Sequence, residues 1–178
     1  FINKILPRRS LLARRAVGRP GERQVIASNI DVAFIVQAIS NNFSLARMVN
    51  PVWDGCIASS VPDFREWLEK TQFPLFAWSS QARGFFVPGR AAPDKTEDRE
   101  LAHSWYSDDN FERRRRCFEL AEKRGVHPIT IALAYVLNQS FPVFALIGPM
   151  AVSEINPCID GLNISLTKDE MAWLDLRK

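Results

Sequence analysis

The alternation of strand and helix signals after residue 31 is the feature that most constrains this chain. In order, the sequence predicts strand, loop, helix, strand, loop, helices, strand and helix. Such alternation is typical of βα units around a parallel sheet. Only about three strands are present, and three βα units cannot close an eight-stranded barrel. We therefore expect an α/β fold with a sheet that has exposed edges.

The expected strands cover residues 31–39, 73–78 and 141–147, and the run VAFIVQAI is typical of a buried parallel strand. Four helices are expected. The first starts at Pro62-Asp63 with Asp63 as its cap, and the second covers 111–124, with a cap at Asp109 or Asn110 and an end at Gly125. The third covers 129–138, and the fourth covers 169–176 after the capping box Thr167–Glu170. Polar residues 40–42 form a break after the first strand.

Charge is uneven along the 178 residues. Residues 1–40 hold seven Lys/Arg against two acidic residues, a net +5, and the rest of the chain carries −2. Arg8, Arg9, Arg14 and Arg15 lie in this basic N-terminal β arm and fit contact with phosphate. A solvated basic terminus explains the same composition, so both interpretations stay open.

Cysteine and histidine spacing argues against a metal site. The three cysteines form no CxxC pair, and His103 and His127 are far apart. No apolar run is long enough for a transmembrane helix, and no secretory signal is recognisable, so we expect reduced thiols, a cytoplasmic location and no membrane partner. Phe1 in place of Met indicates a fragment or a processed chain.

Chemistry in α/β folds is expected at the carboxyl ends of the strands, here residues 40–42, 78–84 and 148–154. The middle segment could hold a nucleotide, with Trp78 stacking on a ring and Ser79 and Arg83 reaching a pyrophosphate. The last segment offers free backbone N–H groups to phosphate. A tryptophan that ends a buried strand is also a common core residue.

A resemblance follows from FPLFAWSSQARGFF, ELAHSWYSDDNFERRRRCFELAEKRGVHPITIALAYVL, FPVFALIGPMAVSEI and LTKDEMAWLDL. From about residue 40 to the end, these motifs resemble the C-terminal part of bacterial aldo/keto reductases. The resemblance implies a (β/α)8 TIM barrel that binds NADP(H) in extended form and reduces carbonyls without a metal. The chain would then be a partial barrel that consists of about the last three βα units.

The resemblance also implies a set of cofactor contacts. Trp78 matches the aromatic residue that stacks on nicotinamide. The other matching positions are Ser79, Gln81 and Gly84 near the pyrophosphate, Gly148 and Pro149 in the loop after the last strand, and Glu154 near the adenine. Just after this Gly-Pro, relatives often carry a basic or hydroxyl residue that holds the 2′-phosphate. This chain has Met150-Ala151 there, so the choice between NADP(H) and NAD(H) is open.

The family's catalytic Asp, Tyr, Lys and His have no match here, because they come from the first half of the barrel. Tyr106 and His103 are poor substitutes, since the tyrosine needs its neighbours to act as a general acid. We therefore expect no catalytic residue in this chain.

The N-terminal segment resembles a different family. LPRRSLLARRAVGRPGERQVIASNIDVAFIVQAI is similar to the link between the OB domain and the GTPase domain in circularly permuted GTPases of small-ribosomal-subunit biogenesis. No NKxD or GxxxxGK[ST] motif follows, so GTP binding is not expected. The domains would be residues 1–40 and 41–178, with a seam at Ser40-Asn41-Asn42.

Together these patterns predict an oxidoreductase fragment that keeps part of an NADP(H) site. The alternatives are an RNA- or ribosome-binding module that acts through the basic arm, and a chimera produced by recombination without a function of its own. Exposed sheet edges offer a further route of association.

Overall fold

The computed structural model describes residues 37–177. The chain divides into two units, residues 1–39 and 40–178, and almost all of the first lies outside the described residues. The strand signals before residue 37 also lie outside the described residues, and so do Arg8, Arg9, Arg14 and Arg15 of the basic arm.

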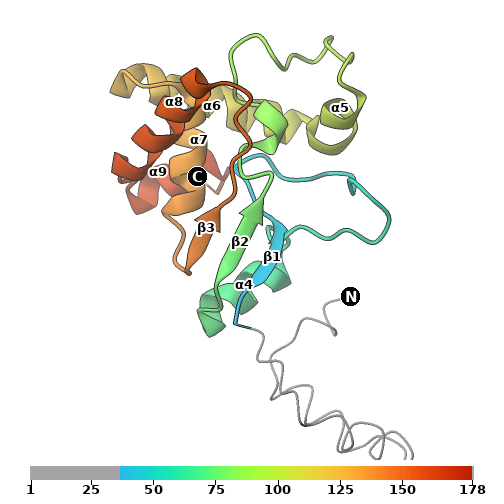
Figure 1. The fold of residues 1–178 in the computed structure, drawn as a ribbon, viewed down its shortest axis with the longest axis vertical. Coiled ribbons are helices and arrows are strands. Elements are labelled where there is room, and N and C mark those ends of the chain that lie inside the picture. The colour runs from blue at the N-terminus through green and yellow to red at the C-terminus, as the bar shows by residue number, and fades with distance from the viewer. Residues whose placement is uncertain (1–36, 178) are drawn as a thin grey trace, which may run out of the picture. The chain divides into compact units, whose positions relative to one another are not determined.

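Three strands form one sheet in the order β1-β2-β3 (Figure 1). They are β1 (Ile39–Asn42), β2 (Leu75–Trp78) and β3 (Val143–Ala145). β2 and β3 are parallel, with Phe76 opposite Phe144. The predicted α/β class with a parallel sheet is confirmed. Residues 40–42 belong to β1 instead of following a strand, because strand pairing uses the backbone and tolerates their polar side chains.

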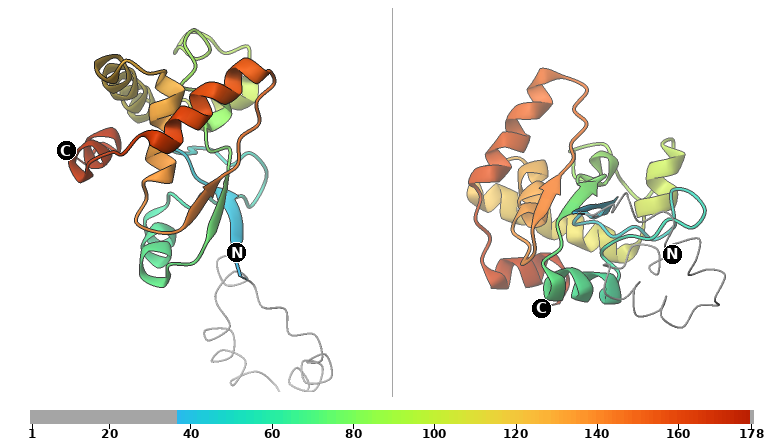
Figure 2. Two further views of the ribbon diagram at one scale, coloured as in Figure 1. Left: turned by 60° about the vertical axis from the view of Figure 1, so that its left-hand side comes forward. Right: turned by 60° about the horizontal axis from the view of Figure 1, so that its bottom comes forward.

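Helices connect and follow the strands. They are α4 (Pro62–Thr71) between β1 and β2, α5 (Arg99–Trp105), α6 (Asp108–Arg124) and α7 (Pro128–Leu137) between β2 and β3, and α8 (Ile155–Asp160) and α9 (Lys168–Leu174) after β3. α7 packs beside β3, α8 packs on α7, α9 packs on α6, and α5 lies on the β1 side (Figures 1 and 2). Among residues 37–177, none of these helices has the length and apolar character needed to span a bilayer.

Helix ends follow local hydrogen bonding. Gly125 ends α6 in the left-handed conformation, with φ of 66°, and Thr167 and Glu170 form the predicted capping box of α9. The cap predicted at Asp109 or Asn110 is wrong, because the Ser107 hydroxyl accepts the Asn110 N–H and adds a turn. The cap predicted at Asp63 is also wrong, since Pro62 starts α4 and places Asp63 in its first turn.

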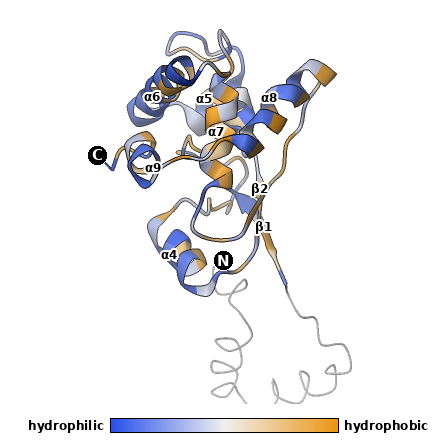
Figure 3. Cartoon of the chain, turned by 90° about the vertical axis from the view of Figure 1, so that its left-hand side faces the viewer, coloured by the Kyte–Doolittle hydropathy of each residue, from blue (hydrophilic) through white to orange (hydrophobic). Residues whose placement is uncertain are grey.

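The core lies between the sheet and the helices. α7 is largely apolar in Figure 3, and its residues from Thr130 to Val136 are buried. Leu75 and Ala77 of β2 are fully buried, whereas Phe76 and Phe144 alternate to the other face and are 39% and 53% exposed. Their rings stack at a centroid distance of 5.0 Å. One face of the sheet is therefore covered, and the other presents aromatic side chains.

A buried carboxylate links elements that are far apart in the sequence. Asp175, which caps the C-terminus of α9, is 2% exposed. Its oxygens accept hydrogen bonds from Arg47 Nη2 after β1 and Arg65 Nη1 on α4, both at 2.9 Å, and form an ion pair with Arg177 Nε at 3.0 Å. Tyr135 of α7 also contacts Arg65, at 3.2 Å. The ends of the described unit are thus connected through one side chain.

A second carboxylate organises the long connection after β2. Asp98 accepts the Leu101 N–H at 3.1 Å and so caps α5. It also pairs with Arg83 and Arg90, each at 3.1 Å. Burial alone would raise the pKa of Asp98, but the Leu101 N–H and the Arg83 guanidinium more than offset this and lower it.

Replacing Asp175 should destabilise the fold strongly. Asp175→Asn keeps the shape but leaves Arg47 and Arg65 without their buried counter-charge, and removing one partner of a buried pair costs about 3–5 kcal/mol. Urea titration followed by circular dichroism measures the free energy of unfolding. Glu66→Gln is the control, since it breaks an exposed pair with Lys70 and should cost at most about 1 kcal/mol. Equal losses in the two variants would contradict the assignment.

Asp98 should make stability depend on pH. Its folded pKa lies below the unfolded one, so its contribution is complete above the unfolded value of about 3.9 and is lost as pH falls through the folded value. Asp98→Asn keeps a good helix cap without the charge. The variant should be less stable than wild type at pH 7, and the gap should shrink below about pH 4.

Urea midpoints at pH 7, 5, 4 and 3 measure this gap. Asp94→Asn, an exposed position in the same connection, is the matched control and should follow wild type. A gap between wild type and Asp98→Asn that stays constant over this range would argue against a charge effect.

Candidate functional site

The carboxyl ends of the three strands lie together. The amide of Asn42 donates from Nδ2 to the Trp78 carbonyl oxygen at 3.3 Å, and the Phe43 N–H donates to the same oxygen at 3.4 Å. On the other side, Leu146 N donates to Ala77 O at 3.0 Å, and Ser80 Oγ donates to Leu146 O at 2.7 Å. The segments predicted to carry chemistry are thus neighbours because their strands are neighbours.

Trp78 is half-buried at the end of β2 and stacks on another indole. The ring centroids of Trp53 and Trp78 are 5.0 Å apart with an interplanar angle of 28°. Trp53 lies in the loop between β1 and α4 and is 56% exposed. Sequence reasoning gave Trp53 no role, although an exposed tryptophan in a loop after a strand was a usable signal.

The segment after β2 is tightly wound. Ser79, Ala82, Arg83 and Gly84 all have positive φ, at 48°, 47°, 54° and 80°. A Cβ at Gly84 would lie 2.9 Å from Arg90 Cδ, so the absence of a side chain there permits close packing.

Gln81 joins the two loops. Its Nε2 donates to Cys158 Sγ of α8 at 2.9 Å, and that thiol contacts the Glu154 carbonyl oxygen at 3.1 Å. This contact brings the segment after β2 to the segment after β3.

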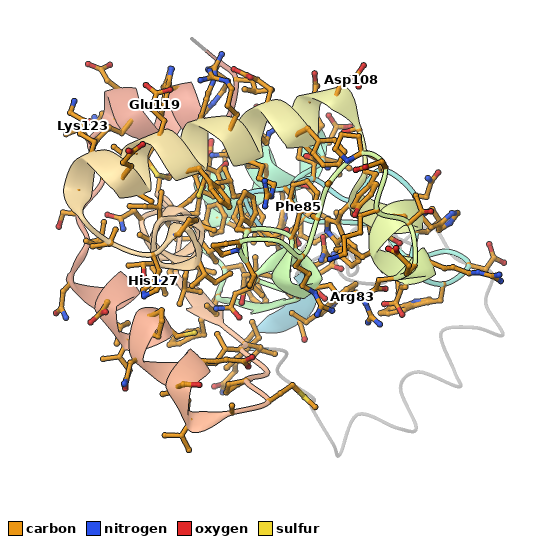
Figure 4. All side chains as sticks on the ribbon, turned by 90° about the horizontal axis from the view of Figure 1, so that it is seen from above. Arg83, Phe85, Asp108, Glu119, Lys123 and His127 are labelled. Carbon is orange, nitrogen blue, oxygen red and sulfur yellow. The ribbon has the colours of Figure 1, made fainter. Side chains whose placement is uncertain are left out.

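Arg83 points away from this junction, toward the start of α5 (Figure 4). Its Nε lies 3.1 Å and 3.2 Å from the two Asp98 oxygens, and its Nη1 lies 3.1 Å from Glu100. Arg90 Nε donates to the Arg83 carbonyl oxygen at 3.0 Å. The charge of Arg83 is already compensated, so an anion would have to compete with two carboxylates.

The loop after β3 is closed by its own hydrogen bond. The Met150 N–H donates to Glu154 Oε2 at 2.7 Å. Gly148 is exposed and Pro149 half-buried, and Met150 is 92% exposed. Glu154 thus holds its loop, and it ends a short 3-10 turn, Val152–Glu154, before α8.

The other candidate groups lie elsewhere. The carbonyl oxygen of His103 accepts from Asn50, and Tyr106 donates to the carbonyl oxygen of Lys95. His127 is exposed at the start of α7, as predicted for a surface residue. Within residues 37–177, no cluster of three or more His, Cys, Asp or Glu could hold a metal ion.

The three thiols are free, and burial raises the pKa of Cys56 in the Trp53 loop despite an opposing hydrogen bond from the Val52 backbone. A shallow depression of about 490 Å³ lies between Pro93 and α6, and its lining contains none of the predicted cofactor residues.

Comparison with known proteins gives two kinds of match. A model of the aldo/keto reductase family matches residues 28–176. In the N-terminal region, 47 residues are 43% identical to the small ribosomal subunit biogenesis GTPase RsgA of Opitutus terrae and 51% identical to RsgA 1 of Bacteroides thetaiotaomicron. Each of these matches covers 26% of this chain and 13% of the relative, so the chain spans about an eighth of those proteins.

Two solved structures share the fold. The thermostable aldo-keto reductase Tm1743, crystallised with epalrestat, has a TM-score of 0.52 at 18% identity, over 77% of this chain and 38% of that one. An aldo/keto reductase from Klebsiella pneumoniae, crystallised with NADP and acetate, has a TM-score of 0.50 at 16% identity, over 78% of this chain and 38% of that one.

Both sequence resemblances are confirmed. The reductase match starts twelve residues before the predicted boundary at residue 40, so it includes the VAFIVQAI run. Because the family model matches most of the sequence, the chain belongs to the aldo/keto reductase family.

Proposed function

We propose that the chain keeps part of an aldo/keto reductase cofactor site and binds NADP(H) weakly. The observation that carries the proposal is the half-buried Trp78 ring at the carboxyl end of β2, inside the segment that the family model matches. The Klebsiella pneumoniae neighbour was crystallised with NADP, which makes this dinucleotide the first ligand to test.

The proposed cofactor contacts differ in how far each residue must rearrange to form them. Trp78 would stack on the nicotinamide ring, and Ser79 and Gln81 would line the path to the pyrophosphate beside α8. Gly148 and Pro149 would border this path in the loop after β3. Gly84 would contribute by having no side chain, which lets the loop pack closely: a Cβ at this position would lie 2.9 Å from Arg90 Cδ.

Two residues would have to leave existing partners. Arg83 must exchange the carboxylates of Asp98 and Glu100 for phosphate oxygens. Glu154 must release the Met150 N–H to reach an adenine. Both exchanges cost free energy, which is why we propose weak affinity.

Carbonyl reduction by the chain alone is not part of the proposal. We infer that the matched residues lack the family's catalytic Asp, Tyr, Lys and His. Tyr106 already donates to the carbonyl oxygen of Lys95 and packs on Phe111. We further propose that residues 1–40 are a segment of different origin from residues 41–178, that the chain acts in the cytoplasm, and that its free sheet edges allow association.

NADPH titration tests the cofactor site. Nicotinamide emission and calorimetry should show binding in the millimolar range or tighter, and Trp78→Ala should weaken it at least about fivefold, since a base–aromatic stack is worth about 1–3 kcal/mol. Trp67→Phe on α4 is the control, because Trp67 packs on Phe64 and on Phe73 before β2, away from the carboxyl ends of the strands. No binding at millimolar NADPH would end the proposal.

A second candidate function rests on the similarity to the biogenesis GTPases. We propose that Arg8, Arg9, Arg14 and Arg15 contact the phosphates of RNA, a role supported by the 47-residue match and the basic composition of the arm. These residues lie outside the described part of the chain.

Replacing these four arginines with Gln should reduce binding to a ribosomal RNA fragment. It should also make the slope of log K against log salt concentration less steep by roughly three. Filter binding between 50 and 200 mM salt measures both. Arg99→Gln with Arg115→Gln, two exposed arginines in helices, is the control. Equal effects in the two variants, or binding insensitive to salt, would refute the role.

A further inference from the structure

The indole of Trp53 covers the indole of Trp78. Their centroid distance of 5.0 Å and interplanar angle of 28° fall within the range of offset aromatic stacking. Trp53 is more than half exposed and Trp78 is half-buried, so Trp53 covers one face of the Trp78 ring and is the more exposed ring of the pair. A flat ligand that approached this face from solvent would meet Trp53 first.

The loop that carries Trp53 is fixed at its flanks. On one side, Val49 N donates to Ser104 O at 2.8 Å and Asn50 Nδ2 donates to His103 O at 2.7 Å. On the other side, Ser59 N donates to Asn42 O at 2.8 Å. These bonds tie the loop to α5 and to the end of β1.

The tip of the loop is held more lightly. Residues 53–55 are exposed, and the Cys56 N–H closes a turn onto the Trp53 carbonyl oxygen at 3.0 Å, with Gly55 at φ of 76°. The tip can therefore move while its flanks stay in place.

We propose that Trp53 is an internal competitor for the ring face of Trp78 and so sets the apparent affinity for the dinucleotide. This inference rests on the proposed function, because it assigns the same face to the nicotinamide ring. One face of an indole accepts one stacked ring, so Trp53 must swing away before the cofactor stacks. The fraction of molecules with an open face then scales the measured affinity.

The Trp53→Ala variant tests the competition. The stack of two aromatic rings is worth enough to lower apparent affinity about two- to tenfold, so Trp53→Ala should tighten NADPH binding by that factor. Trp53→Phe keeps an aromatic competitor and should stay closer to wild type. Position 53 is exposed, so neither change should disturb the fold.

The outcomes separate the two proposals. If Trp53→Ala binds NADPH as wild type does, or more weakly, while Trp78→Ala still loses binding, the competition is refuted and the cofactor site stands. If neither wild type nor Trp53→Ala binds, the cofactor site itself fails and the competition fails with it.

A second readout follows the ring itself. Stacked indoles give a paired exciton signal in circular dichroism, which Trp53→Ala should remove. Saturating NADPH should also remove it from wild type. A signal that persists in the wild type–NADPH complex would overturn the inference.

Discussion

The described unit depends on the contact between Asp175 and its arginines. A three-stranded sheet offers little surface on which to build a core, and its helices come from widely separated parts of the chain. Arg47 follows β1, Arg65 lies on α4, and Asp175 ends α9, yet their side chains meet within 2.9 Å. A buried carboxylate must be paired, so the geometry of these elements is strongly constrained.

The cost of this arrangement is a concentration of positive charge. Arg113 is also buried, and burial together with the nearby Arg47 lowers its pKa. One carboxylate therefore serves several guanidinium groups, which makes Asp175 harder to replace than any single arginine. Other N–H groups of Arg65 donate hydrogen bonds to Tyr135 and Gln139.

Much of the fold could be predicted from local patterns. The parallel sheet followed from the alternation of strand and helix signals. The end of α6 at Gly125 followed from a glycine after a basic residue, and the α9 cap followed from the spacing of Thr167 and Glu170. Some missed parts were also local, namely the cap at Ser107 and the start of α4 at Pro62. α5 was not predicted although its cap, the Asp98–Leu101 bond, is local, and Asp98 is held in addition by the more distant Arg83 and Arg90. The first predicted strand ended three residues too early, and the second and third were too long by two residues at one or both ends, because pairing partners decide where a ladder stops.

The proximity of the candidate segments at one edge of the sheet was predictable, and their side-chain contacts were less so. Strand order alone indicates that the segments after β2 and β3 are neighbours, and the Gln81–Cys158 contact agrees with this. Sequence could not reveal that Arg83 is held by two carboxylates, that Glu154 closes its own loop, or that Trp53 covers Trp78. Each of these contacts joins a residue to a partner that the family pattern does not specify.

The stacked pair Phe76–Phe144 has a consequence for the life of the chain in a cell. Chaperones recognise unfolded proteins by the aromatic surface that folding normally hides. Among residues 37–177 that surface stays exposed in the folded unit, where Phe76 and Phe144 stack on the face of the sheet opposite to Leu75 and Ala77. A quality-control system that scans for such surface would encounter it on residues 37–177 even after they have folded.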